Sequence, residues 1–224
     1  MRKTNSINDI RNTAKAFLEL DVEDANFAGI VYHPIFESCV FPDENMNLLN
    51  ILEEDGLKKA REIISKQIDT MKAEQIFYVL IRRPYRLIFL KYVQDYLTEK
   101  TYADWLANAW IDSENPNIDR NLTLDDIKEM FLKADRKYLM NKHENEKFRN
   151  LPEVMTLYRG IGEKSNPNGF AWTWDMNVAA WFANRFNEGY IVQAEIPKER
   201  VLAIFDRGES EIVCDTRGIK KTKL

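Results

Sequence analysis

The 224-residue sequence predicts an α+β protein, with a mainly helical lobe over residues 1–149 packed on a small antiparallel or mixed β-sheet core from residues 150–224. Two observations predict this class. Apolar residues recur at helical spacing through the first two thirds of the chain, whereas alternating and β-branched runs separated by turn residues fill the last third. Helices followed by strands are typical of α+β architecture, so we expect the two parts to share a cleft, either as two domains or as one structural unit.

The helical part opens with an amphipathic helix over residues 6–20, whose apolar side chains lie on one face. Residues 28–41 are rich in β-branched and aromatic side chains, which predicts a short extended segment on the surface of the lobe. Residues 57–71 trace the face of a second long helix. Pro84 begins a helix that is apolar on more than one face and is therefore expected to be buried. Thr123 is expected to cap a later helix.

The β-rich part begins with residues 154–160, VMTLYRG, which alternate as a strand. A polar loop and a short helix follow, the helix beginning after a predicted cap at Asp175. The sequence predicts further strands over residues 190–196, 201–206 and 210–215.

Composition and charge exclude several classes of function. The net charge of −4 gives no general attraction to nucleic-acid phosphates. No apolar run approaches the roughly 20 residues that span a bilayer, and no apolar h-region follows the basic N-terminal residues, so we expect a cytoplasmic protein. His33 and His143 lie far apart without flanking ligands, which predicts no metal site. The basic ending, residues 219–224, is expected to be a solvated tail.

Arg159 ends the first predicted strand on the same face as Met155 and Leu157, and Gly160 and Gly162 follow it. A guanidinium in this position is placed to fork onto a phosphate or carboxylate, while the glycines let a ligand approach the backbone. The alternative is an arginine that extends from the strand end to one of the many acidic side chains.

Aromatic side chains concentrate in residues 169–186, GFAWTWDMNVAAWFANRF, which include Trp172, Trp174, Trp181 and Phe186. Such side chains could cover a flat heterocyclic ligand. The alternative is that they make this helix a major packing element of the core.

Two glutamates, Glu209 and Glu211, stand one residue apart in residues 207–213, RGESEIV. On a strand both side chains project to the face opposite Ser210 and Ile212. An exposed polar face is the simplest explanation. If the pair instead lines a cleft, one carboxylate can stabilise the oxocarbenium ion formed when a glycosidic bond breaks, and the other can orient the incoming nucleophile.

Taken in order, these three segments resemble the mono-ADP-ribosyltransferases of the arginine-serine-glutamate class, which use NAD as donor. The family's strand arginine matches Arg159 in LYRG, its serine-threonine-serine strand matches residues 171–173, AWT, and its Glu-x-Glu element matches Glu209-Ser210-Glu211. The match covers about residues 151–215. Residues 1–149 are similar only to the helical lobe that often precedes this fold in small bacterial, toxin-like or phage-encoded transferases, which act in the host-cell cytoplasm.

The resemblance implies a glycosyltransferase that cleaves the nicotinamide–ribose bond of NAD and transfers ADP-ribose to an arginine of an acceptor protein, with NAD hydrolysis as a side activity and without a metal. It implies that Glu211 is the catalytic glutamate and that Glu209 positions the acceptor. Arg159 is expected to hold the phosphate and ribose region of NAD, and the Gly160 backbone the nicotinamide amide. Further NAD contacts are expected from Tyr158, Thr173, Trp172, Trp181 and Phe186.

The sequence departs from the family pattern at Ala171, which stands where the first serine would be. The hydroxyl that fixes the catalytic glutamate is therefore absent, and Thr173 is expected to supply one from the same strand face. Ala171 also motivates a reading from another class, an inhibitory protein that binds NAD or a partner without turnover. A third reading is a helical interaction protein with a structural sheet, in which Glu209 and Glu211 are surface residues.

Overall fold

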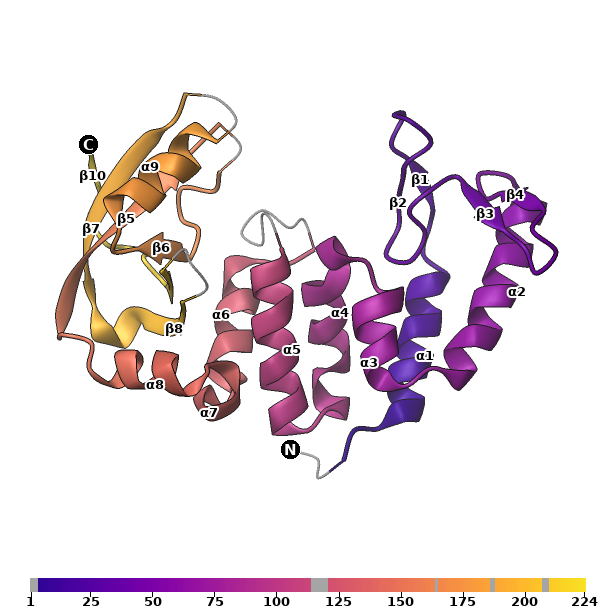
Figure 1. The fold of residues 1–224 in the computed structure, drawn as a ribbon, viewed down its shortest axis with the longest axis horizontal. Coiled ribbons are helices and arrows are strands. Elements are labelled where there is room, and N and C mark those ends of the chain that lie inside the picture. Colours follow the sequence, from indigo (N-terminus) through magenta and orange to yellow (C-terminus); the bar gives the residue numbers. More distant parts are fainter. Residues whose placement is uncertain (1–3, 114–120, 164, 186–187, 207–209) are drawn as a thin grey trace. The chain divides into compact units, whose positions relative to one another are not determined.

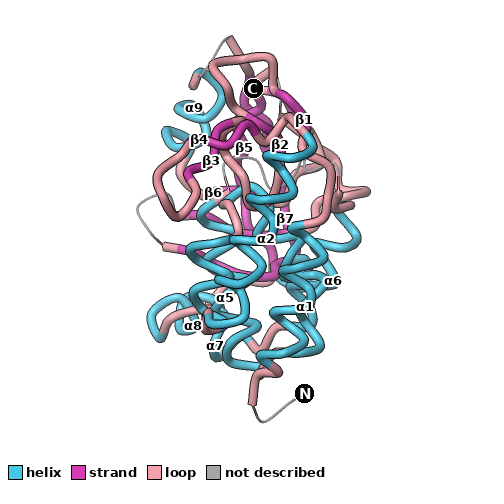
Figure 2. The backbone as a smooth tube through the Cα atoms, turned by 90° about the vertical axis from the view of Figure 1, so that its right-hand side faces the viewer, coloured by secondary structure: helices cyan, strands magenta, loops and turns pink. Residues whose placement is uncertain are grey.

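The computed structural model describes residues 4–113, 121–163, 165–185, 188–206 and 210–224. The chain forms two compact units, Met1–Thr101 and Tyr102–Leu224 (Figure 1). The first unit combines helices with two small hairpins, and the second combines helices with a six-stranded sheet, as the colours of Figure 2 show. The predicted α+β class is therefore confirmed.

Helices of the first unit form where apolar residues recur at helical spacing. Helix α1, Ile7–Leu18, buries Ile10, Ala14 and Phe17 as predicted, and α4, Arg86–Val93, is buried on several faces. The other elements are α2 (Glu54–Thr70), α3 (Ala73–Gln75), η1 (Ile76–Leu80), η2 (Arg83–Tyr85), η3 (Gln94–Tyr96), β1 (Glu23–Asp24), β2 (Val31–Tyr32), β3 (Val40–Pro42) and β4 (Leu48–Asn50). The segment predicted to be extended supplies β2 and β3, which pair with β1 and β4 in two hairpins.

Helix α5, Glu99–Asp112, begins at the end of the first unit and continues into the second. It is followed by α6 (Leu124–Lys133), α7 (Arg136–Leu139) and α8 (Lys142–Arg149). The predicted cap of α6 is confirmed, because the Asp126 N–H donates to Thr123 Oγ1 at 3.1 Å and the Thr123 N–H donates to the Asp126 carboxylate at 3.0 Å.

The sheet of the second unit has the strand order β10-β7-β5-β6-β9-β8, and its strand pairs are antiparallel. Its strands are β5 (Val154–Ile161), β6 (Ala171–Thr173), β7 (Tyr190–Pro197), β8 (Val201–Phe205), β9 (Glu211–Cys214) and β10 (Thr222–Lys223), with α9 (Met176–Asn184) after β6 and η5 (Lys198–Arg200) after β7. Alternation along β5 buries Met155, Leu157 and Arg159 on one face, as the sequence predicts.

The sheet is joined weakly in its middle. Strand β5 pairs with β7 from Val154 to Ile161, but it pairs with β6 only where Tyr158 lies opposite Thr173. Positions 159–161 of β5 therefore have no ladder partner on β6. Backbone donors and acceptors released in this way need other partners, such as side chains or a ligand.

The compact second unit begins at Tyr102, whereas the sequence predicted a division between residues 149 and 150. The physical reason is that α6 and α8 pack on β8. In addition, the Asp206 N–H donates to Glu144 Oε1 on α8 at 3.0 Å. These helices therefore form part of the same core as the sheet. The expected cleft shared between the helical lobe and the sheet stays a prediction.

The C-terminal residues are exposed, as a solvated tail predicts, but the last of them are ordered on the edge of the sheet. Thr222 and Lys223 form β10, which pairs with Gln193 and Val192 of β7 at the edge of the sheet. The tail adopts this order because β7 otherwise exposes a row of unpaired backbone groups. Across the described part of the chain, no helix combines the length and apolar character needed to cross a membrane.

Candidate functional site on strands β5, β6 and β9

Three of the residues predicted from the sequence lie in one cross-strand row. Tyr158 on β5 is directly opposite Thr173 on β6, and Thr173 is directly opposite Glu211 on β9. Directly opposite residues of an antiparallel ladder project to the same face, with Cβ atoms about 4.5–5.5 Å apart. The fold thus brings together side chains from the three segments that the sequence singles out.

Thr173 is the hydroxyl-bearing residue directly opposite Glu211. It is buried, and its Oγ1 accepts a hydrogen bond from the Asp175 N–H at 3.1 Å. Ala171 lies two residues earlier on the same face and pairs with Val213, so it is diagonal to Glu211 in the ladder. A hydrogen bond from the Thr173 hydroxyl to the Glu211 carboxylate stays a prediction.

Arg159 bridges the point at which the β5–β6 ladder ends. Its Nη1 donates to the Ala171 carbonyl, and its Nη2 donates to the Asn166 carbonyl at 3.1 Å. Burial lowers the pKa of Arg159 to about 10, while nearby Cys214 and Glu211 act in the opposite direction. The side chain is 9% exposed, and its buried Nε has no hydrogen-bond partner among the described residues. The positive charge of Arg159 is compatible with the expected binding of a phosphate or carboxylate. Its hydrogen-bond partners in the structure, however, are the carbonyl oxygens of Ala171 and Asn166.

Lys221 is a second cation near Arg159, and no motif in the sequence points to it. Its Nζ donates to the Pro167 carbonyl at 2.9 Å and to Asn168 Oδ1 at 2.8 Å. Burial and the charge of Arg159 lower the pKa of Lys221. Arg159 and Lys221 are close enough to interact electrostatically, and both donate to neutral oxygens within residues 166–171. Together they make this end of the β5–β6 junction electropositive.

Glu211 receives a hydrogen bond from an unexpected element. Trp110 on α5 donates from its indole Nε1 to Glu211 Oε1 at 2.9 Å. Trp110 is only 2% exposed, whereas Glu211 is partly exposed at the first position of β9. A buried helix of the same unit therefore donates to the carboxylate that the resemblance implies is catalytic.

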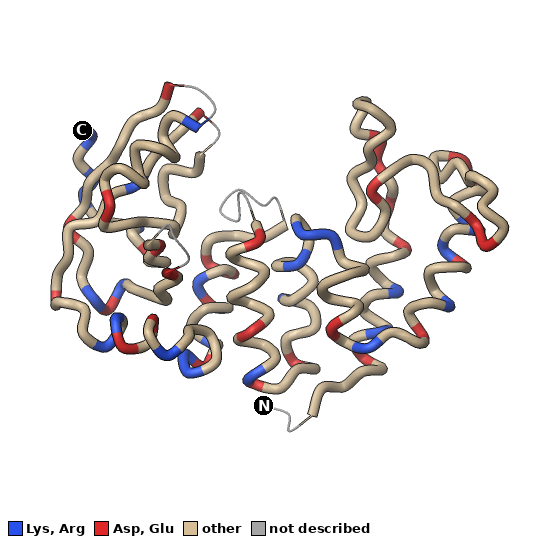
Figure 3. Tube along the Cα trace, in the orientation of Figure 1, with Lys and Arg blue, Asp and Glu red and all other residues tan. Residues whose placement is uncertain are grey.

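The strand prediction is wrong at Ser210, because β9 begins at Glu211 and Ser210 has φ 47°, in the left-handed region. Strand alternation therefore does not place Glu209 on the same face as Glu211. Glu209 lies outside the described residues. The backbone before this segment is anchored at Asp206, whose pKa is lowered by its hydrogen bond from Lys147. Figure 3 shows the alternation of basic and acidic residues along α8, which supplies Lys147 and Glu144.

The predicted aromatic contacts separate into different environments. Trp172 is 2% exposed and its Nε1 donates to the Gly169 carbonyl at 3.0 Å, so it is a core side chain with no surface left for a ligand. Trp181 is 55% exposed, and it lies two positions from Ala179 and Ala183, the helix residues that face the sheet. Side chains two apart on a helix point in different directions, so Trp181 faces away from the strands. Phe186 lies outside the described residues.

Gly160 has a structural reason that the sequence did not reveal. A Cβ atom at this position would lie 2.1 Å from the Ala179 carbonyl oxygen and 2.5 Å from the Ala183 nitrogen. The absent side chain lets the backbone of α9 pack directly on β5, and Figure 1 shows the two elements together. Contact between the Gly160 backbone and nicotinamide stays a prediction.

Substitution of Gly160 by valine is expected to destabilise the protein by at least about 3 kcal/mol, because α9 must move away from β5. Thermal unfolding should show a fall in Tm of about 10 °C. The matched control is Gly162→Ala, where the added Cβ would meet its nearest neighbour, the Ala183 carbonyl oxygen, at an ordinary 3.6 Å. An unchanged Tm for the Gly160 variant would contradict the packing argument.

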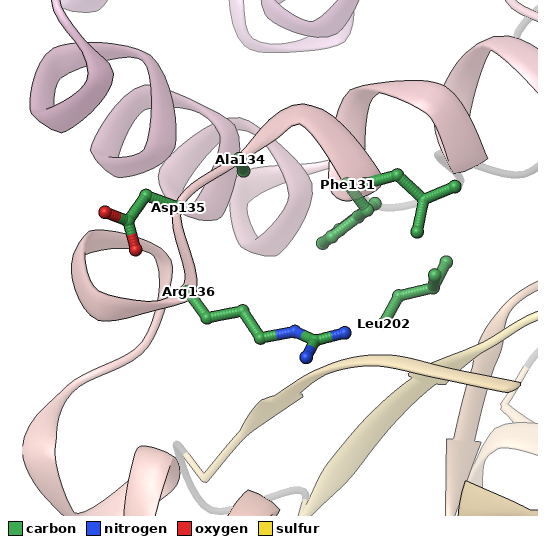
Figure 4. A pocket seen from close by; sticks show the side chains of 6 residues that line it. Phe131, Ala134, Asp135, Arg136 and Leu202 are labelled. Atoms are coloured by element: carbon green, nitrogen blue, oxygen red, sulfur yellow. The ribbon is translucent and has the colours of Figure 1, made fainter. Parts of the chain in front are cut away.

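An open pocket of about 440 Å³ lies beside α6 and β8, and its lining includes none of Tyr158, Thr173 and Glu211 (Figure 4). Its lining residues are Phe131, Leu132, Ala134, Asp135, Arg136 and Leu202. The charged residues of this pocket already have structural partners: Asp135 caps α7 through the Lys137 N–H, and Arg136 lies over the Phe148 ring. The pocket therefore receives no role in the candidate site.

Comparisons of the chain with protein-family models, with curated proteins and with solved structures find no match. Within the ranges that the structure describes, no three or more His, Cys, Asp or Glu side chains are grouped so that they could hold a metal ion. A function for this chain is therefore inferred from the geometry of its own residues.

Proposed function

We propose that the protein is an NAD-dependent mono-ADP-ribosyltransferase of the arginine-serine-glutamate class, with an arginine of an acceptor protein as the target. The observation that carries this proposal is the cross-strand arrangement of the three motif segments. Arg159 follows Tyr158 on β5, Thr173 is opposite Tyr158, and Glu211 is opposite Thr173. The motifs are individually weak, and it is their adjacency in one sheet that supports combining them. Alternation turns the Arg159 side chain to the face opposite Tyr158, so Arg159 is adjacent to the row through the strand and through its charge near Glu211.

The proposed chemistry uses the negative charge of Glu211. As the bond between ribose C1′ and nicotinamide breaks, nicotinamide leaves with the bonding electron pair as a neutral molecule, and positive charge develops on the ribose. A carboxylate fixed beside that ribose stabilises the charge by several kcal/mol in a partly buried site. A guanidinium nitrogen of the acceptor then bonds to C1′ and gives up one proton. Water in its place gives hydrolysis.

The cations at the β5–β6 junction have a role in binding. Arg159 and Lys221 supply positive charge close to the end of the row, which suits the pyrophosphate of NAD. Arg159 also donates to the Asn166 and Ala171 carbonyls, which ties residue 166 to the start of β6. Such preorganisation lowers the entropic cost of binding a flexible dinucleotide.

Glu209 is proposed to bind the acceptor guanidinium, because arginine stays protonated and favours a carboxylate partner. Glu209→Gln is expected to preserve slow NAD hydrolysis and to reduce transfer to arginine at least about 10-fold. Nicotinamide release and labelling of an arginine-containing acceptor, measured on the same preparation, separate the two activities. Equal loss of both, or of neither, would contradict this role for Glu209.

Ala171 favours a second candidate, an inhibitory protein that binds NAD or a partner without turnover. This candidate predicts NAD binding by calorimetry without nicotinamide release. The transferase predicts both, together with labelling of a protein.

The experiment that tests the proposed function is incubation of the purified protein with labelled NAD and a cell lysate, followed by mapping of the labelled residue. The expected result is nicotinamide release together with label on arginine. Release without protein labelling indicates a hydrolase, and label on another residue type corrects the acceptor. Neither release nor label, with the protein folded, rejects the transferase.

A further inference from the structure

Trp110 connects the helical core of the second unit to Glu211. The indole belongs to α5, and its Nε1–H donates to Glu211 Oε1 at 2.9 Å. An indole N–H can only donate, so Glu211 Oε1 is the acceptor in this contact. Sequence reasoning did not find the contact, since the two residues are 101 positions apart.

The position of the indole is fixed by aromatic packing. The Trp110 ring meets the Phe131 ring of α6 edge to face at a centroid distance of 5.2 Å. Phe131 in turn lies 6.4 Å from the ring of Phe205, which is directly opposite Glu211 on β8. Trp110 and Phe205 are each 2% exposed, and Phe131 is 3% exposed. A donor on a buried ring that packs against a second buried ring keeps one direction, which a flexible surface side chain does not.

We infer that Trp110 is a positioning residue that takes over the role of the hydroxyl missing at Ala171. This inference rests on the proposed function, because it assigns the contact to the orientation of the catalytic carboxylate. Ala171 is diagonal to Glu211 in the β6–β9 ladder, so a hydroxyl at position 171 would lie within reach of a glutamate side chain. In this chain α5 supplies a donor to Glu211 from outside the sheet. The departure from the family pattern therefore does not leave the carboxylate without a side-chain donor.

The contact leaves the carboxylate able to act on a substrate. A carboxylate offers about four acceptor positions, and a single indole occupies one of them. The indole thus restricts the rotation of Glu211 through one of its two oxygens, Oε1. Correct placement of a reacting group is worth about 100-fold in rate when a shift of about 1 Å is prevented.

The first test is kinetic. Trp110→Phe keeps an aromatic ring in the core but removes the N–H, and it is expected to lower kcat for nicotinamide release by roughly 10- to 100-fold with little change in KM for NAD. Trp105→Phe is the matched control, because Trp105 is equally buried on the same helix and has no assigned role. Wild-type kcat in a folded Trp110→Phe variant overturns the inference.

The second test is rescue. Adding Ala171→Ser to the Trp110→Phe variant supplies a hydroxyl donor from β6 and is expected to recover at least about 5-fold in kcat, more than the same serine adds to the wild type. A structural role in packing alone would not be repaired by a hydroxyl on a strand. Equal effects of the serine in the two backgrounds would count against a shared partner.

The third test is independent of activity. The Trp110 indole N–H signal, followed by ¹H–¹⁵N NMR during an acid titration, is expected to shift as the carboxylate takes up a proton and to lose that shift in Glu211→Gln. A Trp110 signal that ignores the titration overturns the contact itself. If the signal titrates but the wild type releases no nicotinamide, the proposed function fails, and the catalytic meaning of the contact fails with it.

Discussion

Glu211→Gln is expected to lower nicotinamide release by about 1,000-fold while the fold and NAD binding persist. The substitution removes the negative charge that stabilises the oxocarbenium-like transition state. Because the ribose of bound NAD carries less positive charge than it does in the transition state, the substitution slows the reaction more than it weakens binding. Glutamine keeps an oxygen that can accept the hydrogen bond from Trp110, so the contact to α5 has a replacement. The measurement is the rate of nicotinamide release at saturating NAD, together with calorimetric NAD binding.

The control for this variant is Glu195→Gln on β7. Glu195 is an exposed glutamate of the same sheet that accepts a hydrogen bond from Thr156 at 2.7 Å, and glutamine can accept the same bond. It changes the net charge equally but lies outside the row, so its rate should remain at the wild-type value. Comparable rates for Glu211→Gln and wild type, with matching Tm values, would falsify the catalytic assignment.

The strands that carry the site could be predicted because each has a local signature. Residues 154–160 alternate between apolar and polar positions, and β5 forms over Val154–Ile161 with Arg159 on its buried face. The cap at Asp175 also follows from local chemistry, since its side chain accepts the Asn177 N–H at 2.8 Å. Strand alternation and helix caps depend on residues that are close in the chain, so a single sequence is enough to predict them.

The contacts that complete the site are long-range, and no pattern in one sequence encodes them. Trp110 and Lys221 reach the site through the packing of α5 and through the pairing of β10 with β7. Periodicity likewise could not divide the aromatic residues into a buried Trp172 and an exposed Trp181, because both lie in one apolar segment. Ser210 interrupts the expected strand through a backbone conformation that serine rarely adopts.

The structure changes which experiment separates the transferase from an interaction protein with a structural sheet. If the protein were an interaction protein with Arg159 at its surface, Arg159→Ala would change stability little. Arg159 is buried and donates to two carbonyl oxygens, so truncation removes both hydrogen bonds and destabilises the protein under either reading. Stability alone therefore cannot decide, and the test needs a variant that keeps the positive charge.

Arg159→Lys meets that need, and it is expected to weaken NAD binding by about 10- to 100-fold while the protein stays folded. Lysine keeps the charge and can hold one of the two carbonyls, but it lacks the planar fork that contacts the loop and a phosphate together. The measurement is calorimetric NAD affinity, compared with Arg149→Lys as control, since Arg149 is an exposed arginine that also donates to a backbone carbonyl, that of Asn145, at 3.2 Å. If the wild type binds NAD and a folded Arg159→Lys protein binds it equally well, Arg159 acts only as an anchor for the loop. If the wild type binds no NAD, the proposed NAD site is rejected. The cross-strand row is then a structural feature, and the interaction-protein reading stands.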